Sequence, residues 1–248
     1  MYLINNQPIL DLSQYVDLDS LLEMKPYLDY AVVMSSSISS PSQYSTVQLF
    51  DKNSRGVLNV LDDYLDNIDK KSKEFPFLKE LKDTDKLCRW LCLHENLVYG
   101  QQSVQIIYMT DWKTKHLSKH CIKTDNIKYF QPFFDWLDKQ NIFSDYGRTV
   151  VFLNEPLATT PTHFDGYGNR GPNKDQFVWF GLDDRKKLYV LDNDTNTKHY
   201  LTSQVGIFES ANYHGADPSD LANWSLRVDG VFSDSFLAKT GLTEHFKK

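Results

Sequence analysis

Residues 147–166 read GRTVVFLNEPLATTPTHFDG, and they are the most informative segment for the fold. Its apolar run from Thr149 to Leu153 predicts a buried β-strand. If the residues that follow are also extended, the side chains of His163 and Asp165 point to one face and that of Phe164 points to the other. An imidazole beside a carboxylate is half of a metal site. The rest of the chain then has to supply a third ligand and the walls of a pocket.

Strand patterns dominate the sequence after Gly147, and polar turn residues separate them. The expected strands are residues 148–153, 176–182, 187–191, 205–208 and 224–232. Many short strands joined by polar turns are typical of a sandwich or barrel of the jelly-roll kind. We therefore predict an α+β fold with a jelly-roll or cupin-like core over residues 147–233.

The first 146 residues have a mixed, mainly helical pattern and are expected to flank that core within one domain of 248 residues. Helices are predicted over residues 19–25, over residues 56–96 with a break at Pro76, and from an N-cap at Asp125 to Leu137. Strands are predicted at residues 2–4, 30–34 and 104–109. The serine-rich residues 35–42 predict a loop, which is either a plain connection or a cover over the site.

The composition is that of a soluble globular protein, with 41% hydrophobic and 24% charged residues. No apolar run approaches the roughly 18 residues that a membrane helix needs, and the first residues do not resemble a signal peptide. A net charge of -6 argues against a nucleic-acid partner, since phosphate binding requires a basic surface. The cysteines Cys88, Cys92 and Cys121 show no extracellular spacing, so a reducing, cytoplasmic compartment is expected. Cys88 and Cys92 are expected to pack on one helix face.

The third metal ligand is expected to be His214. It ends the segment GIFESANYHG (206–215), in which a strand runs into a turn, as suits a ligand at the mouth of a barrel. His199 also lies downstream, but polar turn residues surround it and favour an exposed position. Two histidines and one carboxylate on one face leave adjacent coordination positions open, which is the arrangement used for non-haem Fe(II).

An arginine lies in the last expected strand. Ser225 and Arg227 share one strand face, whereas Leu226 and Val228 share the other. A buried guanidinium needs an anionic partner, and its fork fits a carboxylate at two points. That partner is either a bound carboxylate or Asp229, which lies on the same strand face, and we favour the bound carboxylate.

Taken together, His163-x-Asp165, His214 and a final Ser225-x-Arg227 strand resemble the pattern of the 2-oxoglutarate- and Fe(II)-dependent oxygenases. The resemblance covers residues 147–233. Within the family, the segment that leads into the ligand pair looks most like that of the aspartyl/asparaginyl and free-proline hydroxylases. It implies a double-stranded β-helix core. It also implies that His163, Asp165 and His214 bind iron and that Arg227, with Ser225 beside it, binds the distal carboxylate of 2-oxoglutarate.

The same resemblance implies the reaction. Fe(II) would be bound as the cofactor, and 2-oxoglutarate and O2 would be consumed. Ascorbate would serve as the reductant in assays. Succinate and CO2 would leave as an amino acid, a peptide or another small molecule is hydroxylated. The carboxylate of Asp165 indicates hydroxylation, because halogenating relatives have a small residue at this position.

Other residues are weaker candidates for the same site. Asn154 either faces the barrel and binds the cosubstrate or ends its strand in an Asn-Glu-Pro turn. Lys187 and Tyr189 share a strand face and are further candidates for the cosubstrate. Tyr167 and Arg170 lie in the loop after the ligand pair and are candidates for substrate contact, since Arg170 suits a carboxylate.

A second candidate metal site consists of His116 and His120, which are four residues apart and would share a helix face as a zinc pair does. No second pair of ligands stands near them, and the surrounding lysines suggest a solvated face. A rival to the oxygenase is a cupin-like binding or isomerase domain without redox chemistry. Asp165 paired with Arg227 favours the oxygenase, since a non-redox cupin has no need of that pair.

Overall fold

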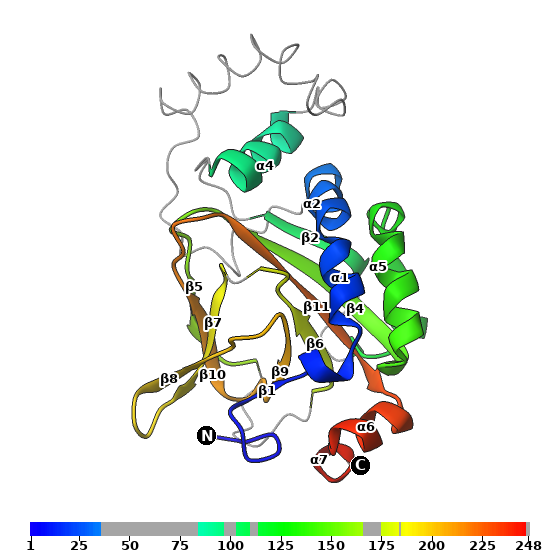
Figure 1. Cartoon of the computed structure of the whole chain (residues 1–248), viewed down its shortest axis with the longest axis vertical. Coiled ribbons are helices and arrows are strands. Elements are labelled where there is room, and N and C mark those ends of the chain that lie inside the picture. The colour runs from blue at the N-terminus through cyan, green and yellow to red at the C-terminus, as the bar shows by residue number, and fades with distance from the viewer. Residues whose placement is uncertain (36–83, 97–102, 110–113, 166–174, 184, 247–248) are drawn as a thin grey trace.

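Two antiparallel β-sheets form the centre of the molecule in the computed structural model (Figure 1). The structure describes residues 1–35, 84–96, 103–109, 114–165, 175–183 and 185–246. The larger sheet contains, in spatial order, β1 (Ile9–Asp11), β9 (Val205–Phe208), β6 (Phe177–Phe180), β11 (Asn223–Phe232), β4 (Phe143–Asn154), β2 (Ser103–Met109) and β3 (Ile122–Lys123). The smaller sheet contains β5 (Thr160–His163), β10 (Tyr213–Asp217), β7 (Lys187–Asp192) and β8 (Thr197–Tyr200).

The larger sheet is buried on both faces. Alternate residues of a strand point to opposite faces, so each of its strands contributes to both. Leu226 and Val228 of β11 belong to the core that the helices share. Ser225 and Arg227 point the other way, toward the smaller sheet, where their hydrogen-bond partners lie. A second apolar cluster lies between the sheets and consists of Phe177, Trp179, Leu188, Val190, Leu201 and Phe208. The predicted α+β fold with a jelly-roll core is confirmed.

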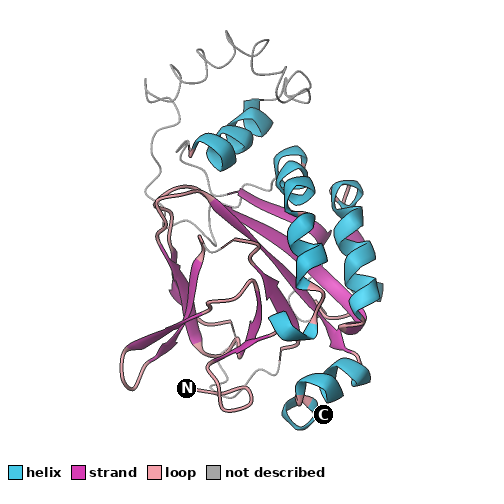
Figure 2. Ribbon diagram, viewed as in Figure 1, coloured by secondary structure: helices cyan, strands magenta, loops and turns pink. Residues whose placement is uncertain are grey.

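Helices cover the outer face of the larger sheet, where α2 and α5 lie side by side (Figure 2). The helices are η1 (Ser13–Tyr15), α1 (Leu18–Glu23), α2 (Lys25–Met34), α4 (Thr84–Glu95), η3 (Ser118–His120), α5 (Ile127–Gln140), α6 (Asp234–Thr240) and α7 (Thr243–Phe246). In the part of the chain that the structure describes, none of them is long and apolar enough to cross a membrane.

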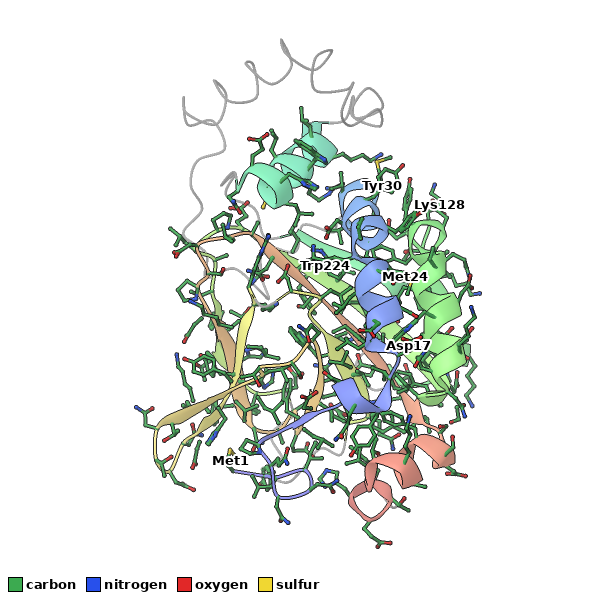
Figure 3. All side chains as sticks on the ribbon, in the orientation of Figure 1. Met1, Asp17, Met24, Tyr30, Lys128 and Trp224 are labelled. Atoms are coloured by element: carbon green, nitrogen blue, oxygen red, sulfur yellow. The ribbon has the colours of Figure 1, made fainter. Side chains whose placement is uncertain are left out.

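Two side chains show how the helices attach to the sheet. Phe133 of α5 is buried and meets Phe180 of β6 edge to face, with ring centroids 5.3 Å apart. Such a pair adds roughly 0.5–1.5 kcal/mol to the burial of the rings themselves. Trp224 of β11 lies beside α2 (Figure 3), and its indole N–H donates to Asp29 at 2.6 Å. The helix layer is thus fixed by packing and by one directional bond.

Most of the predicted elements in the described residues are confirmed. The aromatic helix is α5, and the strand at residues 104–109 is β2. The helical pattern of residues 56–96 is described only from residue 84 on, where α4 confirms it. The predicted loop at residues 35–42 lies outside the described residues apart from Ser35. The predicted boundary between the flanking region and the core, at residues 146 and 147, remains a prediction. Strands β1 and β2 come before this boundary and nevertheless join the larger sheet.

Three local predictions were wrong. The strand expected at residues 30–34 is the second half of α2, because a short apolar run fits a buried helix as well as a strand. The strand expected at residues 2–4 is a single bridge between Ile4 and Gln7. The residue at the N-cap of α5 is Asn126 rather than Asp125, and no side chain caps this helix.

Candidate metal centre

Strands β5 and β10 bring the two predicted histidines together. His163 and His214 are direct partners across the antiparallel pair, and their ring centroids are 4.4 Å apart. Asp165 follows β5, and its backbone N–H donates to the carbonyl of Ser210 at 2.9 Å. The ligand atoms of His163, Asp165 and His214 all lie within 4.8 Å of one another. We call these three residues the ligand triad.

The two rings of the ligand triad are held in one tautomer. Nδ1 of His163 lies 2.8 Å from the carbonyl of Pro161, and Nδ1 of His214 lies 2.8 Å from the carbonyl of Asn212. A carbonyl only accepts, so each Nδ1 carries the proton and each Nε2 keeps its lone pair. These Nε2 atoms are 3.8 and 4.0 Å from Oδ1 of Asp165. Backbone contacts of this kind orient metal ligands.

The protonation states of the ligand triad also favour the binding of a cation. Burial lowers the pKa of His214 to about 4, although the nearby Asp165 acts to raise it. Burial acts to raise the pKa of Asp165, but Arg227 and the two histidines outweigh it and lower that pKa to about 2. At neutral pH, His214 is therefore neutral and Asp165 is ionised, which are the forms that bind metal.

The donor set fits Fe(II). Two neutral imidazoles and one carboxylate, with further positions left for small molecules, are typical of non-haem iron enzymes that use O2. His214 is buried, whereas the His163 side chain is 43% exposed, so the ligand triad has a closed side and an open side. The ring of Phe208 packs 4.9 Å from that of His214 and excludes water from the closed side.

Arg227 contacts the ligand triad directly. Its Nη1 donates to Oδ2 of Asp165 at 2.7 Å, while its Nε and Nη2 donate to Oδ1 of Asp229 at 3.1 and 3.0 Å. The guanidinium also lies over the ring of Phe177, 4.0 Å from its centroid. The sequence interpretation disfavoured a pair between Arg227 and Asp229, and on this point it was wrong. The assignment of Arg227 to the cosubstrate stays a prediction.

Asp229 extends this contact into a buried ionic network. It accepts from Arg148 at 2.9 Å and lies 3.4 Å from Nζ of Lys115. Lys115 in turn donates to Asp175 at 2.8 Å. Arg227 lowers the pKa of the fully buried Asp229 more than Arg148 and Lys115 do, and together they overcome the effect of burial. With Asp165, the network balances three cations against three carboxylates, as a buried set of charges requires.

Lys115 shows what the sequence interpretation missed near His116 and His120. The lysine is buried, with 1% of its side chain exposed, whereas its surroundings were expected to be solvated. His116 lies 3.6 Å from Asp175, and His120 is exposed. Within the described ranges, metal-ligand geometry occurs at the ligand triad and not at this histidine pair. No signal in the sequence links Lys115 to Asp175 or Asp229.

Gly147 permits the approach of the Lys115 backbone to β4. A Cβ added at this position would lie 2.1 Å from the Lys115 carbonyl, which already accepts from the N–H of Arg148 at 2.7 Å. We expect Gly147→Ala to lower the free energy of unfolding by about 1–3 kcal/mol, because the clash is with backbone. Urea denaturation measures this change. The exposed Ser144→Ala on the same strand should stay within about 0.5 kcal/mol of the wild type, and an equal loss in both variants would contradict the argument.

The other cosubstrate candidates lie on the inner face of the jelly-roll. Ser225 is fully buried and accepts a hydrogen bond from Nζ of Lys186 at 2.8 Å. Asn154 ends β4, is buried and lies opposite Asn223 of β11. Among the described residues, neither of these two asparagine carbonyl oxygens has a hydrogen-bond partner.

The buried lysine near β7 is not the one considered from the sequence, because it lies directly before the strand. Lys187 is exposed, and the hydroxyl of Tyr189 is hydrogen bonded to Thr162 at 2.6 Å. Lys186, one residue earlier, is the buried one. Side chains alternate along a strand, so an error of one residue in the expected phase exchanges the inner and outer faces.

Tyr167 and Arg170 lie outside the described residues, and their substrate role stays a prediction. His199 lies in β8, opposite Val190 of β7, and is half-buried rather than exposed. It is not a member of the ligand triad. Of the candidate cysteine pair, Cys92 is buried as expected, and the Cys88 side chain lies outside the described residues.

No family model matches the sequence, and no curated protein matches it. Solved structures do match. One is a Pseudomonas putida prolyl-4-hydroxylase (14% identity, 53% of this chain and 71% of that chain, TM-score 0.30). Another is an oxidoreductase of the 2OG-Fe(II) oxygenase family from Burkholderia pseudomallei (10% identity, 52% and 67%, TM-score 0.37).

A third similar structure is a prolyl hydroxylase from Trichoplax adhaerens in complex with a hypoxia inducible factor peptide fragment (16% identity, 57% of this chain and 66% of that chain, TM-score 0.31). Of these three structures, the one from Burkholderia pseudomallei carries the family name that the sequence pattern suggested. At such identities and TM-scores, the function of this chain has to follow from its own residues.

Proposed function

We propose that this chain is an Fe(II)- and 2-oxoglutarate-dependent oxygenase that hydroxylates an amino acid, a peptide or another small molecule. The observation that carries the proposal is the ligand triad, in which two fixed Nε2 atoms and one ionised carboxylate converge within 4.8 Å. The partly exposed His163 gives the site its open side. A carboxylate as third ligand occupies the position that a halide would need, which supports hydroxylation.

The chemistry that iron supplies here is activation of O2 coupled to oxidative decarboxylation of 2-oxoglutarate to succinate and CO2. The protein contributes orientation and a dry pocket. His163 and His214 would hold iron through the Nε2 atoms that their backbone contacts leave available, and Asp165 would hold it through the oxygen that Arg227 does not engage. The cluster of aromatic and aliphatic side chains between the sheets excludes water from the closed side of the site.

A peptide is a reasonable substrate class to test alongside free amino acids. One of the similar structures is a prolyl hydroxylase with a bound peptide fragment. In this chain, Tyr167 and Arg170 follow Asp165 in sequence and are proposed to contact the substrate. Arg170 would pair with a substrate carboxylate.

Succinate formation tests the proposal. With Fe(II), 2-oxoglutarate, ascorbate and air, we expect the chain to form succinate slowly without a substrate and faster with the right amino acid or peptide. Asp165→Ala should form none, because iron then has two protein ligands. If no substrate pool gives succinate and Asp165→Ala binds metal as well as the wild type, the chain is the rival non-redox cupin.

A further inference from the structure

The short segment between β9 and β10 contacts two members of the ligand triad through its backbone. It consists of residues 209–212, and we call it the ligand bracket. The carbonyl of Ser210 accepts from the N–H of Asp165 at 2.9 Å, and the carbonyl of Asn212 lies 2.8 Å from Nδ1 of His214. Both Ser210 and Asn212 are buried. Two of the three ligands are therefore oriented by main-chain oxygens of one four-residue segment.

The side chain of Asn212 ties the ligand bracket to the first residues of the chain. Its Oδ1 accepts from the N–H of Tyr2 at 2.8 Å, and its Nδ2 donates to the carbonyl of Tyr2 at 2.7 Å. The carboxamide thus makes the same pair of hydrogen bonds as a residue of a neighbouring antiparallel strand. One residue, Asn212, therefore joins Tyr2 through its side chain and His214 through its carbonyl.

The other polar side chains of the ligand bracket are held from different directions. The hydroxyl of Ser210 donates to Oδ2 of Asp175 at 2.8 Å, which brings the bracket into contact with the buried ionic network. The carboxylate of Glu209 is buried and lies 3.6 Å from Nε2 of His245 in α7. The position of the bracket is thus set by three separate parts of the chain, and Asn212 provides the attachment nearest in sequence to His214.

His163 is oriented without the ligand bracket. Its Nδ1 lies 2.8 Å from the carbonyl of Pro161, which belongs to β5 itself. A disturbance of the bracket should therefore change the ring of His214 and leave the ring of His163 as it is. This difference provides an internal control, because a general loss of stability would affect both rings.

The two bonds to Tyr2 require a carboxamide at position 212. An aspartate has the same shape but no N–H, so its carboxylate would face the carbonyl oxygen of Tyr2 with no donor between them. Leaving buried polar groups unpaired in this way is costly, and a shift of the ligand bracket would relieve the cost. Such a shift moves the carbonyl of Asn212 away from Nδ1 of His214.

We propose that Asn212 is a positioning residue for His214, and that its two bonds to Tyr2 hold the carbonyl that keeps the proton on Nδ1 of this ring. The inference rests on the proposed function, in which His214 binds iron through Nε2. An imidazole that loses the acceptor at Nδ1 populates both tautomers, and the tautomer with a proton on Nε2 cannot bind metal there.

Nitrogen NMR of the histidine rings tests the positioning role in the metal-free protein. At pH 7, the ¹⁵N shifts of the wild type should show the proton on Nδ1 in both His163 and His214. Asn212→Asp should give a mixture of tautomers at His214 and the wild-type state at His163. The signals of His214 are identified by their loss in His214→Ala.

Asn5→Gly is the matched control. Asn5 is a second asparagine of the N-terminal segment, and its Nδ2 donates to the carbonyl of Thr240 at 3.1 Å, away from the ligand triad. Its φ of 48° is one that glycine adopts freely, so this variant removes the side-chain bond alone. It should keep the wild-type tautomer in both rings.

Metal binding gives the second readout. Asn212→Asp should bind Mn(II) roughly 10-fold more weakly than the wild type, as expected for loss of a contact that orients a ligand. The absorption spectrum of its Co(II)-loaded form should also differ from that of the wild type. Asn5→Gly should match the wild type in both measurements. All spectra are recorded where each variant is folded by circular dichroism.

Every outcome supports or overturns the positioning role. A folded Asn212→Asp that keeps the wild-type tautomer of His214 overturns it, and so does a lower stability with unchanged tautomer and Mn(II) affinity. If Asn212→Asp does not fold, Tyr2→Pro removes the N–H that Asn212 accepts, and Tyr2→Ala, which keeps this N–H, is its control. If the wild type binds no Mn(II), the proposed function fails, whereas the tautomer of His214 still decides the role of Asn212.

Discussion

Replacing His214 by alanine is expected to abolish metal binding and succinate formation. In the proposed site His214 supplies one of three ligands, and its ring is fixed by the bond from Nδ1 to the carbonyl of Asn212. The variant retains only His163 and Asp165, so the affinity for Fe(II) or Mn(II) should fall by more than about 100-fold, beyond what loss of an outer contact costs. Calorimetric titration of the metal-free protein with Mn(II), in parallel with succinate detection, measures both effects.

His199→Ala is the matched control for this variant. His199 lies in β8 of the same sheet and takes no part in the ligand triad. It should bind Mn(II) with wild-type affinity. Retention of full metal affinity by His214→Ala, with wild-type folding shown by circular dichroism, would place the metal elsewhere and remove the basis of the proposed function.

Replacing Arg227 by methionine is expected to weaken both the fold and the metal site. Arg227 lies between the carboxylates of Asp165 and Asp229, and Asp229 is fully buried. Removing one partner of a buried ionic set costs about 3–5 kcal/mol of unfolding free energy. Urea denaturation measures this loss. The exposed pair of Lys198 and Asp217 provides the comparison, since Lys198→Met should cost at most about 1 kcal/mol.

The same variant tests whether Arg227 positions a metal ligand. Without the bond from Nη1 at 2.7 Å, Asp165 is free to turn, and metal affinity should fall roughly 10- to 100-fold. The absorption spectrum of the Co(II)-loaded protein should change as well, which a loss of stability alone would not produce. Arg227→Lys restores the charge but not the planar fork and should recover stability more than affinity. A wild-type Co(II) spectrum in Arg227→Met argues against the positioning role.

The amino-acid sequence was enough to predict the fold class and to indicate His163, Asp165 and His214 as candidate metal ligands. Alternation along β11 placed Leu226 and Val228 against the helices and Ser225 and Arg227 inside, because a strand has a period of two whatever surrounds it. The histidines and Asp165 were recognisable because few residue types bind iron and their order along the strands was informative. The error at residues 30–34 arose because a short apolar run satisfies a buried helix and a buried strand equally.

The pairing of the buried charges, in contrast, became visible only in the assembled structure. Lys115 and Asp175 are far apart in the sequence and close in space, and nothing in their local sequence predicts the pair. Which of Lys186 and Lys187 is buried depends on the exact start of β7, since a shift of one residue moves a side chain from solvent into the barrel. Local periodicity follows from backbone geometry and is visible in the sequence, whereas partners across a barrel follow from strand register, which the assembled sheets fix.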